Sequence, residues 1–382
     1  MFKKYDAHIA GYYGMQNSGD DALMYATVWG AKKLLHCEST SIGLYDNNNA
    51  GAGSDTVNRA NNQPLQVNRQ RPLYYKQAFS GQNRLIQYQA AIQSKGVIFG
   101  GGSVLHSVSD INLKRHLMML AGRANSRAVG VSLGPFQSIA AEKSCTDFLN
   151  ECGFVGVRDQ KSFELAQSLA PQANIEKTFD LAPLLLCANK QILSNNSRQG
   201  VALSLCPVAV DPSGCVDEKA EKKRLSELCH LLETLYKSTG EAITLLTFNG
   251  HDQLGDWKIN HDIKACLENK LPITVKAYNP NPFAVLQDLA NYKAVISMRL
   301  HGSILSYLKN TPVISLNYHE KCQGWCTQIG LAKNYQFNPQ CLDVEGIRQQ
   351  IEQGLEYGFT QSSLIVADAL KSALSNWSTS HE

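Results

Sequence analysis

Residues 294–316 have the sequence AVISMRLHGSILSYLKNTPVISL, and this stretch decides the fold class. The apolar residues 294–297 and 313–316 predict two buried strands, and the amphipathic residues 302–309 predict a helix between them. Strands joined through a helix run parallel, because a parallel pair needs such a crossover connection. The stretch therefore predicts a βαβ unit in a parallel sheet.

The same alternation of strand and helix extends along the chain in both directions. Further strands are predicted at 7–12, 96–99, 128–133, 154–157, 201–205, 243–248 and 273–277. Helical patterns occupy residues 20–35, 111–124, 139–150, 160–169, 217–238, 255–269 and 283–291. Residues 45–82 are polar and predict a long loop that ends in a helix. Such alternation favours parallel sheets covered on both faces, and hence an α/β protein.

A polar, turn-forming segment at residues 194–200 is the best candidate for a linker. The length of 382 residues also suits two domains. We expect domains at 1–193 and 200–382, with the last helix free to pack back on the first. Each is predicted to be a Rossmann-like, doubly wound domain, and the two are expected to face each other across a cleft.

The composition excludes several classes of protein. Hydrophobic residues make up 43% and charged residues 18%, which is unlike a disordered or collagen-like chain. The net charge is +3, with 36 Lys and Arg against 33 Asp and Glu, and no basic stripe is visible. A nucleic-acid partner is therefore not expected.

The spacing of the cysteines and the lengths of the apolar runs indicate in which cellular compartment the protein is expected. The 11 cysteines are scattered, and the closest, Cys322 and Cys326 near His319, lack the second ligand pair of a zinc site. We expect no bound metal and reduced thiols. No signal peptide is visible at the N-terminus, and no run approaches the roughly 18 apolar residues that span a membrane. These features predict a soluble protein of the cytoplasm.

The strongest local signal for chemistry is Arg299 and His301, which directly follow a predicted strand and open a predicted helix. A helix N-terminus attracts anions, and an arginine fork fits a carboxylate or a phosphate. A histidine transfers protons near neutral pH. The alternative is a surface ion pair for Arg299 and a helix-capping role for His301.

Two further cations follow predicted strands. Arg158 ends a strand of the first half, and with Arg299 opposite it the two could hold both ends of a small dianion. The structural alternative is an ion pair with Asp159. Lys321 comes just after the strand at 313–316, where it is either a third charge for the same anion or a solvated surface group.

Two glycine-rich loops lie in the first half. Residues 11–21 do not match G-x-G-x-x-G, so a nicotinamide site is not indicated. Asp20 and Asp21 in this loop are interpreted as helix caps, or Asp20 as a carboxylate that binds or deprotonates a sugar hydroxyl. Residues 100–103 are expected to end a strand and to let the backbone approach a ligand, or else to form a tight turn.

Taken in order, these segments resemble the polysaccharide pyruvyltransferase family. The matching blocks are the N-x-G-D core within 11–21, VIFGGGS at 97–103, GVSLGP at 130–135, GVRD at 156–159, DLA at 180–182, VISMRLHG at 295–302 and residues 312–321. The blocks span about residues 7–330. GGG or GVRD alone is a weak signal, whereas the ordered set with R-L-H-G is specific.

The resemblance implies a fold similar to the two-domain glycosyltransferases of the B type, with phosphoenolpyruvate as donor and no metal or redox cofactor. The first domain would face the acceptor and the second the donor. Substrate-binding positions implied by the match are Arg158, Arg299, Leu300, Lys321, Asn17, Gly101 and Gly102, of which Arg158, Arg299 and Lys321 fall in the donor pocket. His301 and Asp20 fall on the positions with a catalytic role.

The function that the resemblance implies is transfer of the enolpyruvyl unit to a sugar as a ketal, with release of phosphate. The acceptor would belong to a cell-surface polysaccharide, as an oligosaccharide or a lipid-linked glycan that brings the enzyme to the membrane surface. Two alternatives stay open. One is a nucleotide-sugar glycosyltransferase of the same architecture, and the other is a non-catalytic protein that binds sugars or anions.

Overall fold

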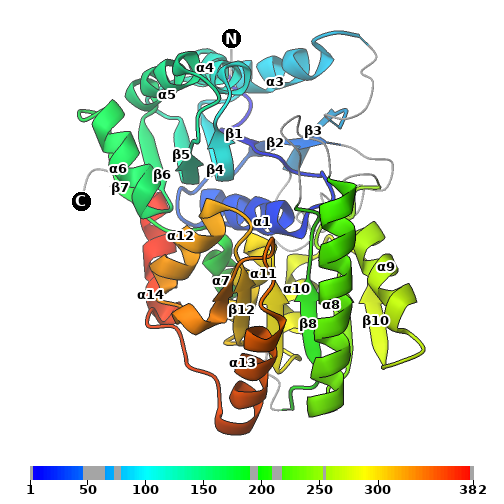
Figure 1. Ribbon diagram of the computed structural model, residues 1–382. Helices are drawn as coiled ribbons and strands as arrows, with labels where there is room; N and C mark the ends of the chain where they lie inside the picture. The colour runs from blue at the N-terminus through cyan, green and yellow to red at the C-terminus, as the bar shows by residue number, and fades with distance from the viewer. Residues whose placement is uncertain are drawn as a thin grey trace. The chain divides into compact units, whose positions relative to one another are not determined.

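The computed structural model describes residues 3–45, 65–72, 79–189, 197–208, 217–252 and 255–378 (Figure 1). The chain divides into two compact units. Unit 1 consists of Met1–Gln16, Asp20–Lys190 and Ala367–Glu382, and unit 2 of Asn17–Gly19 and Gln191–Val366. The predicted linker at 194–200 falls partly outside the described residues. The short piece Asn17–Gly19 was not expected in the second unit.

Unit 1 is built on a seven-stranded sheet in which every described pairing is parallel. Its order is β3-β2-β1-β4-β5-β6-β7. The strands are β1 Ala7–Ala10, β2 Thr40–Tyr45, β3 Leu65–Gln70, β4 Val97–Leu105, β5 Arg127–Leu133, β6 Phe154–Val157 and β7 Ile175–Lys177. Fully buried residues such as Ile9, Val129 and Val155 form the core of this sheet.

Helices cover both faces of that sheet. α3 (Gln82–Ile92), α4 (Val108–Ala121) and α5 (Ile139–Glu151) lie along one face, and α1 (Ser18–Lys33) lies on the other (Figure 1). α6 (Gln160–Leu169) packs on β5 and β7. Local sequence sets where several helices begin. Ser107, Ser138 and Asp159 accept hydrogen bonds from backbone N–H groups at the starts of α4, α5 and α6.

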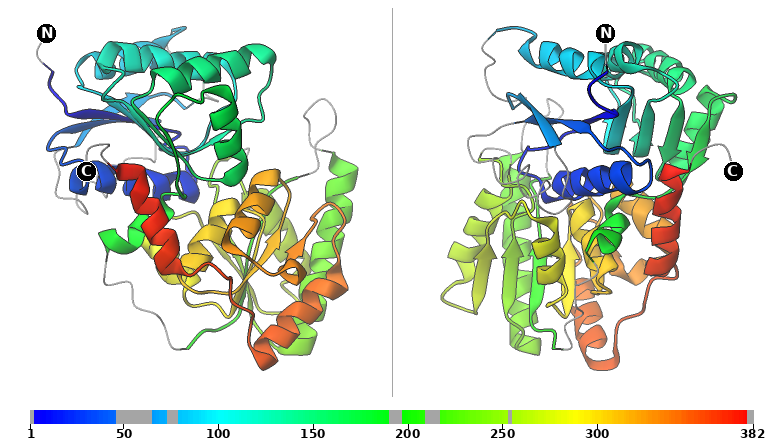
Figure 2. Two further views of the ribbon diagram at one scale, coloured as in Figure 1. Left: turned by 90° about the vertical axis from the view of Figure 1, so that its left-hand side faces the viewer. Right: turned by 180° about the vertical axis from the view of Figure 1, so that it is seen from behind.

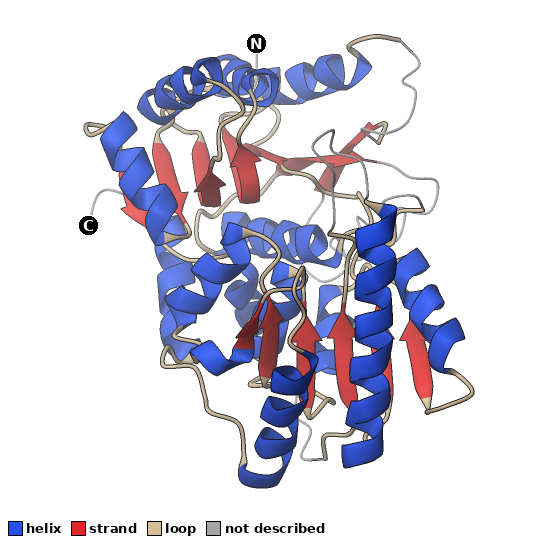
Figure 3. Ribbon diagram, in the orientation of Figure 1, coloured by secondary structure: helices blue, strands red, loops and turns tan. Residues whose placement is uncertain are grey.

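Unit 2 repeats the same plan on a six-stranded parallel sheet (Figure 3). Its order is β10-β9-β8-β11-β12-β13. The strands are β8 Val201–Ser204, β9 Ile243–Leu246, β10 Ile273–Lys276, β11 Ala294–Ser297, β12 Val313–Leu316 and β13 Gln336–Phe337. The helices are α8 Glu218–Thr239, α9 Trp257–Leu267, α10 Pro282–Leu289, α11 Leu300–Leu308, α12 Glu320–Ile329 and α13 Val344–Tyr357. α8 packs beside α13 and α9 (Figure 2).

Both sheets therefore have the 3-2-1-4-5-6 strand order of the doubly wound fold, and the predicted fold class is confirmed. Both also contain a point where the order reverses, between β1 and β4 and between β8 and β11. Open α/β sheets bind ligands outside the carboxyl ends of their strands at this point. The topology thus identifies one candidate position in each unit.

The structure corrects several of the predicted element boundaries, among them the following three. Residues 65–70, which fall in the predicted long loop, form β3 and pair with β2 along its whole length. β4 does not end at Phe99 but continues to Leu105, with a register shift between Gly102 and Leu105. Helix α11 begins at Leu300, two residues earlier than predicted. For β3 and β4, pairing with a neighbouring strand overrides the local pattern. The start of α11 differs by two residues, as helix ends commonly do.

The C-terminal residues belong to unit 1. After α14 (Val366–Leu374), the buried Asn376 accepts hydrogen bonds from Gly130 N at 2.6 Å and from Thr178 Oγ1 at 2.9 Å. The side-chain amide of Asn376 also donates to Phe179 O at 3.0 Å. These contacts tie the turn at Ser375–Trp377 to the middle of β5 and to the residues that follow β7. In the part of the chain that the structure describes, no helix is long and apolar enough to cross a membrane.

Candidate active site

The candidate site of unit 2 lies where its strand order reverses. Cys206 follows β8, and Arg299 follows β11, the neighbouring strand. Lys321 comes after β12, the next strand along the sheet. Because the strands are parallel, their carboxyl ends meet at one edge, and the residues that follow them gather there.

Arg299 is held by a buried carboxylate that the sequence did not reveal. Its Nε donates to Asp256 Oδ1 at 3.1 Å, and its Nη2 donates to the same oxygen. The other oxygen of Asp256 accepts from Phe248 N at 3.0 Å and from Asn249 N at 2.9 Å. The Asp256 side chain is 0% exposed, whereas that of Arg299 is 19% exposed. Asp256 therefore fixes one edge of the guanidinium and leaves its outer end accessible.

The electrostatics of this pair keep Arg299 charged. Burial alone lowers the pKa of Arg299, but the Asp256 carboxylate reverses this and holds the pKa above its ordinary value. An arginine presents five N–H donors in a planar fork. With Nε and one donor of Nη2 directed at Asp256, the Nη1 end can still bind a carboxylate or a phosphate.

Asp256 precedes helix α9 and sits in the loop after β9, at the same sheet edge. In sequence it resembles an ordinary N-cap, so no local signal marks it as the partner of Arg299. The hint that the sequence offered was the position of Asp256 after the predicted strand at 243–248.

His301 lies in the first turn of α11, which begins at Leu300. Its side chain is partly buried, and Leu300 before it is 8% exposed. Leu300 can therefore contact a ligand chiefly through its backbone N–H. The first N–H groups of a helix lack partners within the helix and favour an anion. Arg299, the helix terminus and His301 thus form one compact set on a single segment.

Lys321 and Tyr318 border this set. The imidazole of His319 caps α12 by accepting a hydrogen bond from Lys321 N at 3.2 Å. Lys321 Nζ lies 5.9 Å from the centre of the Tyr318 ring. Burial raises the pKa of Tyr318 above its ordinary value. In the described residues, His319 and the nearby cysteines do not form a cluster of metal-ligand type.

The buried thiol of Cys206 lies within electrostatic reach of three cations of unit 2. Burial raises the pKa of Cys206 to about 11. Three cations lie within electrostatic reach of this thiol and act in the opposite direction: Arg299, Arg224 and Lys321. The structure therefore brings Arg299 and Lys321 into one neighbourhood, as the sequence predicted for unit 2.

Arg224 is the cation that the sequence analysis missed, because it lies in the charged helical run at 218–224. It is 5% exposed, pairs with Glu221, and donates to Cys206 O at 3.0 Å and to Met298 Sδ at 3.3 Å. Met298 immediately precedes Arg299. Arg224 thus links the segment that follows β8 to the segment that follows β11.

In unit 1, Arg158 forms a closed ion pair. Its Nη1 lies 2.8 Å from Asp180 Oδ2, and its Nε donates to Ser132 Oγ at 2.7 Å. Asp159, the partner in the structural alternative, instead caps α6 by accepting from Ser162 N at 2.9 Å. The GVRD and DLA blocks are therefore linked by this pair. Arg158 and Arg299 belong to different units, and the clamp that they would form stays a prediction.

The glycine-rich loop at 11–21 is divided between the units. Asn17 Oδ1 accepts from Gly19 N at 2.9 Å, so Asn17 is the side-chain cap of α1. Asp20 and Asp21 lie inside the first turn, and the prediction that they occupy the N-cap was wrong because the helix begins at Ser18. Asp20 acts electrostatically on Tyr12 and Tyr13 within unit 1.

The glycines of VIFGGGS lie within β4 and not after it. A Cβ at Gly100 would approach Thr27 Oγ1 and the Tyr13 hydroxyl to 2.2 Å, and one at Gly101 would approach Leu23 to 2.9 Å. Gly101 and Gly102 also have positive φ angles of 67° and 88°. Packing of α1 and Tyr13 on the strand is therefore enough to explain glycine at positions 100 and 101. Substrate contact by Gly101 and Gly102 stays a prediction.

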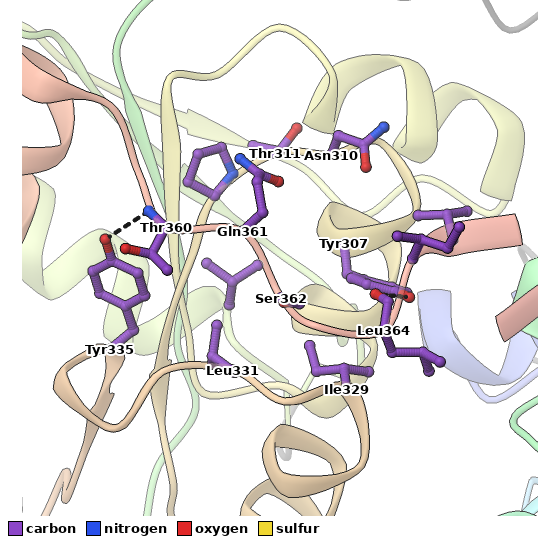
Figure 4. Close-up of a pocket in the computed structure, with 14 residues that line it drawn as sticks. Tyr307, Asn310, Thr311, Ile329, Leu331, Tyr335, Thr360, Gln361, Ser362 and Leu364 are labelled. Atoms are coloured by element: carbon purple, nitrogen blue, oxygen red, sulfur yellow. Dashed lines mark hydrogen bonds between the residues drawn. The ribbon is translucent and has the colours of Figure 1, made fainter. Parts of the chain in front are cut away.

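In the described residues, each of two pockets is lined by residues of one unit alone. A polar pocket of about 40 Å³ opens at the carboxyl ends of β1, β2 and β3 in unit 1, and Tyr12, Gln70, Gln87, Asp110 and Lys114 contribute to its lining. A larger pocket of about 170 Å³ in unit 2 lies by the amino end of β12, with Tyr307, Thr311 and Tyr335 in its wall (Figure 4). The latter is at the opposite end of β12 from Lys321 and does not overlap the candidate site.

Comparison with known sequences gives the family. The profile of the polysaccharide pyruvyl transferase family matches residues 17–320, which include the Arg299 and His301 segment. The chain belongs to this family. The protein is therefore a transferase enzyme. A curated relative, the amylovoran biosynthesis protein AmsJ of Erwinia amylovora, is 22% identical over 332 residues, which cover 78% of this chain and 76% of AmsJ.

Solved structures show the fold relationship. A protein described as a UDP-N-acetylglucosamine 2-epimerase of Listeria monocytogenes superposes with a TM-score of 0.64 at 10% identity, over 96% of this chain and 93% of its own. The UDP-GlcNAc 2-epimerase of Neisseria meningitidis gives 0.59 at 10% identity, over 97% and 98%. The transferase thus shares the two-domain α/β architecture of B-type glycosyltransferases. At this identity the likeness concerns the fold alone.

Proposed function

We propose that this enzyme transfers the enolpyruvyl unit of phosphoenolpyruvate to a sugar and forms a pyruvate ketal. Membership of the polysaccharide pyruvyl transferase family supports the reaction class. The observation that carries the donor assignment is the anchored Arg299 beside His301 and the α11 N-terminus. Phosphoenolpyruvate carries a carboxylate and a phosphate, and this group of cations and N–H donors suits such a dianion.

The proposed reaction begins with a proton on carbon. His301 delivers a proton to the methylene C3, which leaves C2 with oxocarbenium character. A sugar hydroxyl then bonds to C2 and releases its proton to a base, for which Asp20 is the proposed group. The bond from C2 to the phosphate oxygen then breaks, and phosphate leaves with the electron pair. The second hydroxyl bonds to C2 and closes the ketal, and its proton passes to the departing phosphate. Arg299 and Lys321 stabilise the charge that develops on the phosphate.

The acceptor is proposed to be a sugar of an exopolysaccharide or its precursor, as an oligosaccharide or a lipid-linked glycan. The similarity to AmsJ, a protein of amylovoran biosynthesis, supports this class. The polar pocket of unit 1 has the groups that bind sugar hydroxyls. Tyr12 Oη donates to Asp110 Oδ2 at 3.1 Å, Lys114 Nζ lies 2.5 Å from the same oxygen, and Gln87 Nε2 donates to Gln70 Oε1 at 2.8 Å.

The size and charge of this pocket suggest how it would be used. The pocket of about 40 Å³ has room for a small polar substituent. Burial lowers the pKa of Lys114, and Asp110 opposes that shift. The substitution Lys114→Met is expected to reduce turnover with the acceptor while the affinity for phosphoenolpyruvate is unchanged. A loss of donor affinity in this variant would contradict the assignment of the pocket to the acceptor.

The donor half is tested first, by titration calorimetry with phosphoenolpyruvate, UDP and CMP. We expect saturable binding of phosphoenolpyruvate alone, lost in Arg299→Ala and kept in Arg348→Ala, a matched change in the exposed ion pairs of α13. Nucleotide binding without a response to phosphoenolpyruvate would instead favour a nucleotide-sugar enzyme. Phosphate release is then measured against a panel of sugars. Donor binding without release for any sugar would favour a non-catalytic binding protein.

A further inference from the structure

The segment Asn17–Gly19 is far in sequence from the candidate donor site but packs with it in unit 2. Ser18 N donates to Phe248 O at 2.9 Å, and Asn17 forms an antiparallel bridge with Asn249. Phe248 and Asn249 are the residues whose N–H groups hold Asp256. The segment is therefore docked on the loop that anchors Arg299.

The same segment also touches His301 directly. A Cβ built on Gly19 would lie 2.3 Å from His301 Nδ1, 2.6 Å from Cγ and 2.9 Å from Cβ. Such distances are far below van der Waals contact, so the glycine backbone lies flat against the edge of the imidazole. Gly19 is held there because its N–H donates to Asn17 Oδ1 at 2.9 Å. Gly19 itself is buried.

This contact constrains His301 from a direction that its own helix does not cover. The backbone of α11 fixes the Cα of His301, but the ring can still rotate about its two side-chain torsions. A wall against the Nδ1 edge removes orientations that turn the ring toward Gly19. Proton transfer needs a donor atom placed within hydrogen-bonding reach of its target, so the ring orientation bears directly on the rate.

We infer that Gly19 is a positioning residue for His301, and that Asn17–Gly19 forms a wall of the donor site of unit 2. This inference rests on the proposed function, in which His301 delivers the proton. It explains glycine at position 19 by the space that His301 requires. It also assigns a role to Asn17, whose Oδ1 accepts the hydrogen bond that holds Gly19 in place.

The test is the substitution Gly19→Ala, compared with Gly324→Ala in α12, where an added Cβ meets no atom within 4 Å. We expect Gly19→Ala to lower the turnover number by about 100-fold, the size of loss that a displacement of about 1 Å produces. The dissociation constant for phosphoenolpyruvate should change far less, because the bonds that hold Arg299 run to Asp256 and not to Gly19. Gly324→Ala should leave both quantities unchanged.

A second readout needs no acceptor. In ¹H–¹⁵N spectra of the histidine side chains, the resonance that disappears in His301→Ala identifies His301. Gly19→Ala should shift this resonance, and the signals of the other histidines should stay in place. In the His301→Ala background, Gly19→Ala should cause little further loss of turnover, because most of the clash is gone. A folded Gly19→Ala protein with unchanged turnover and an unchanged His301 signal would overturn the inference.

If Gly19→Ala does not fold, Asn17→Ala replaces it. This change removes the acceptor of the Gly19 N–H without adding a clash, and it should shift the His301 signal and lower turnover in the same direction but less. An unchanged signal in folded Asn17→Ala would also count against the inference. Failure of the proposed function looks different, because full turnover in His301→Ala removes the proton-transfer role whatever Gly19→Ala does.

Discussion

Arg158 in unit 1 and Arg299 in unit 2 each follow a strand of a parallel sheet, β6 and β11, yet their surroundings differ. Each follows a strand and pairs with a buried aspartate, Asp180 or Asp256. The side chain of Arg158 is 7% exposed, and that of Arg299 is 19% exposed. Arg158 is bonded through Nε and Nη1 to two different groups, whereas Arg299 meets a single oxygen with one edge.

The difference predicts that Arg158 and Arg299 contribute unequally to stability and to donor binding. An arginine that bonds to two different buried groups is expected chiefly to stabilise its unit. An arginine bonded along one edge to a single carboxylate is oriented by that bond and still has N–H donors for a ligand. The two pairs can be separated by experiment, because they predict different balances of stability and donor affinity.

The largest effect is expected from removing the aspartates. Asp180→Asn leaves the buried Arg158 without its counter-charge and should lower the free energy of unfolding by about 3 kcal/mol or more. Asp256→Asn should lower stability as well, and in addition weaken phosphoenolpyruvate binding, because the guanidinium of Arg299 loses its fixed orientation. Denaturant unfolding and calorimetry measure the two quantities. Equal effects of both variants on donor affinity would remove the contrast between the pairs.

A comparable effect is expected from acid on unit 1, where His8 is fully buried in β1. Burial lowers the pKa of His8 to about 4, and a hydrogen bond with the backbone of Ser41 only partly opposes this. The unfolded chain binds a proton near pH 6.5, so His8 contributes stability above that pH and loses it as the pH falls toward 4. The expected loss is about 3 kcal/mol.

The variant His8→Gln tests this origin of acid sensitivity. Its free energy of unfolding should be lower than that of the wild type at pH 7.5 but should fall less between pH 6.5 and 4.5. Urea unfolding at a series of pH values gives both curves. Parallel curves for the two proteins would show that His8 is not the group responsible.

Replacing each of the two arginines with lysine should have smaller effects than replacing the aspartates, and it separates the roles of the two ion pairs more clearly. Arg299→Lys keeps the charge but loses the planar fork, and phosphoenolpyruvate should bind about tenfold more weakly, or ~1.4 kcal/mol. Arg158→Lys should lower Tm and, if the two arginines clamp one donor, weaken binding as well. Calorimetry and thermal unfolding on both variants decide this. A lower Tm with unchanged affinity would restrict Arg158 to its ion pair with Asp180.

The smallest effect is expected from Arg348→Ala on the exposed face of α13. Its pairs with Glu345 and Glu352 are of the surface type and contribute little. Tm should change by less than about 2 °C, and donor affinity should not change. This variant sets the scale against which the buried pairs are judged. A large loss here would show that charge removal anywhere on unit 2 perturbs the protein.

The sequence by itself determined the fold class and part of the site. Continuous apolar strands and amphipathic helices alternate strongly in residues 294–316 and their flanks, because parallel strands buried on both faces must be apolar throughout. The position of Arg299 and His301 followed from the same pattern. The segment carries strand, arginine, histidine and helix start within ten residues, so no long-range contact was needed to find it.

Only the tertiary structure decided which groups support these residues. Asp256 is 43 positions from Arg299, and Gly19 is 282 positions from His301. Arg224 resembled one more charge on a solvated helix, and 65–70 resembled part of a loop until β2 offered it a partner. Such contacts depend on how distant segments fold together, and neither periodicity nor spacing records them. The residues that bear the chemistry were local in sequence, whereas those that hold them in place were not.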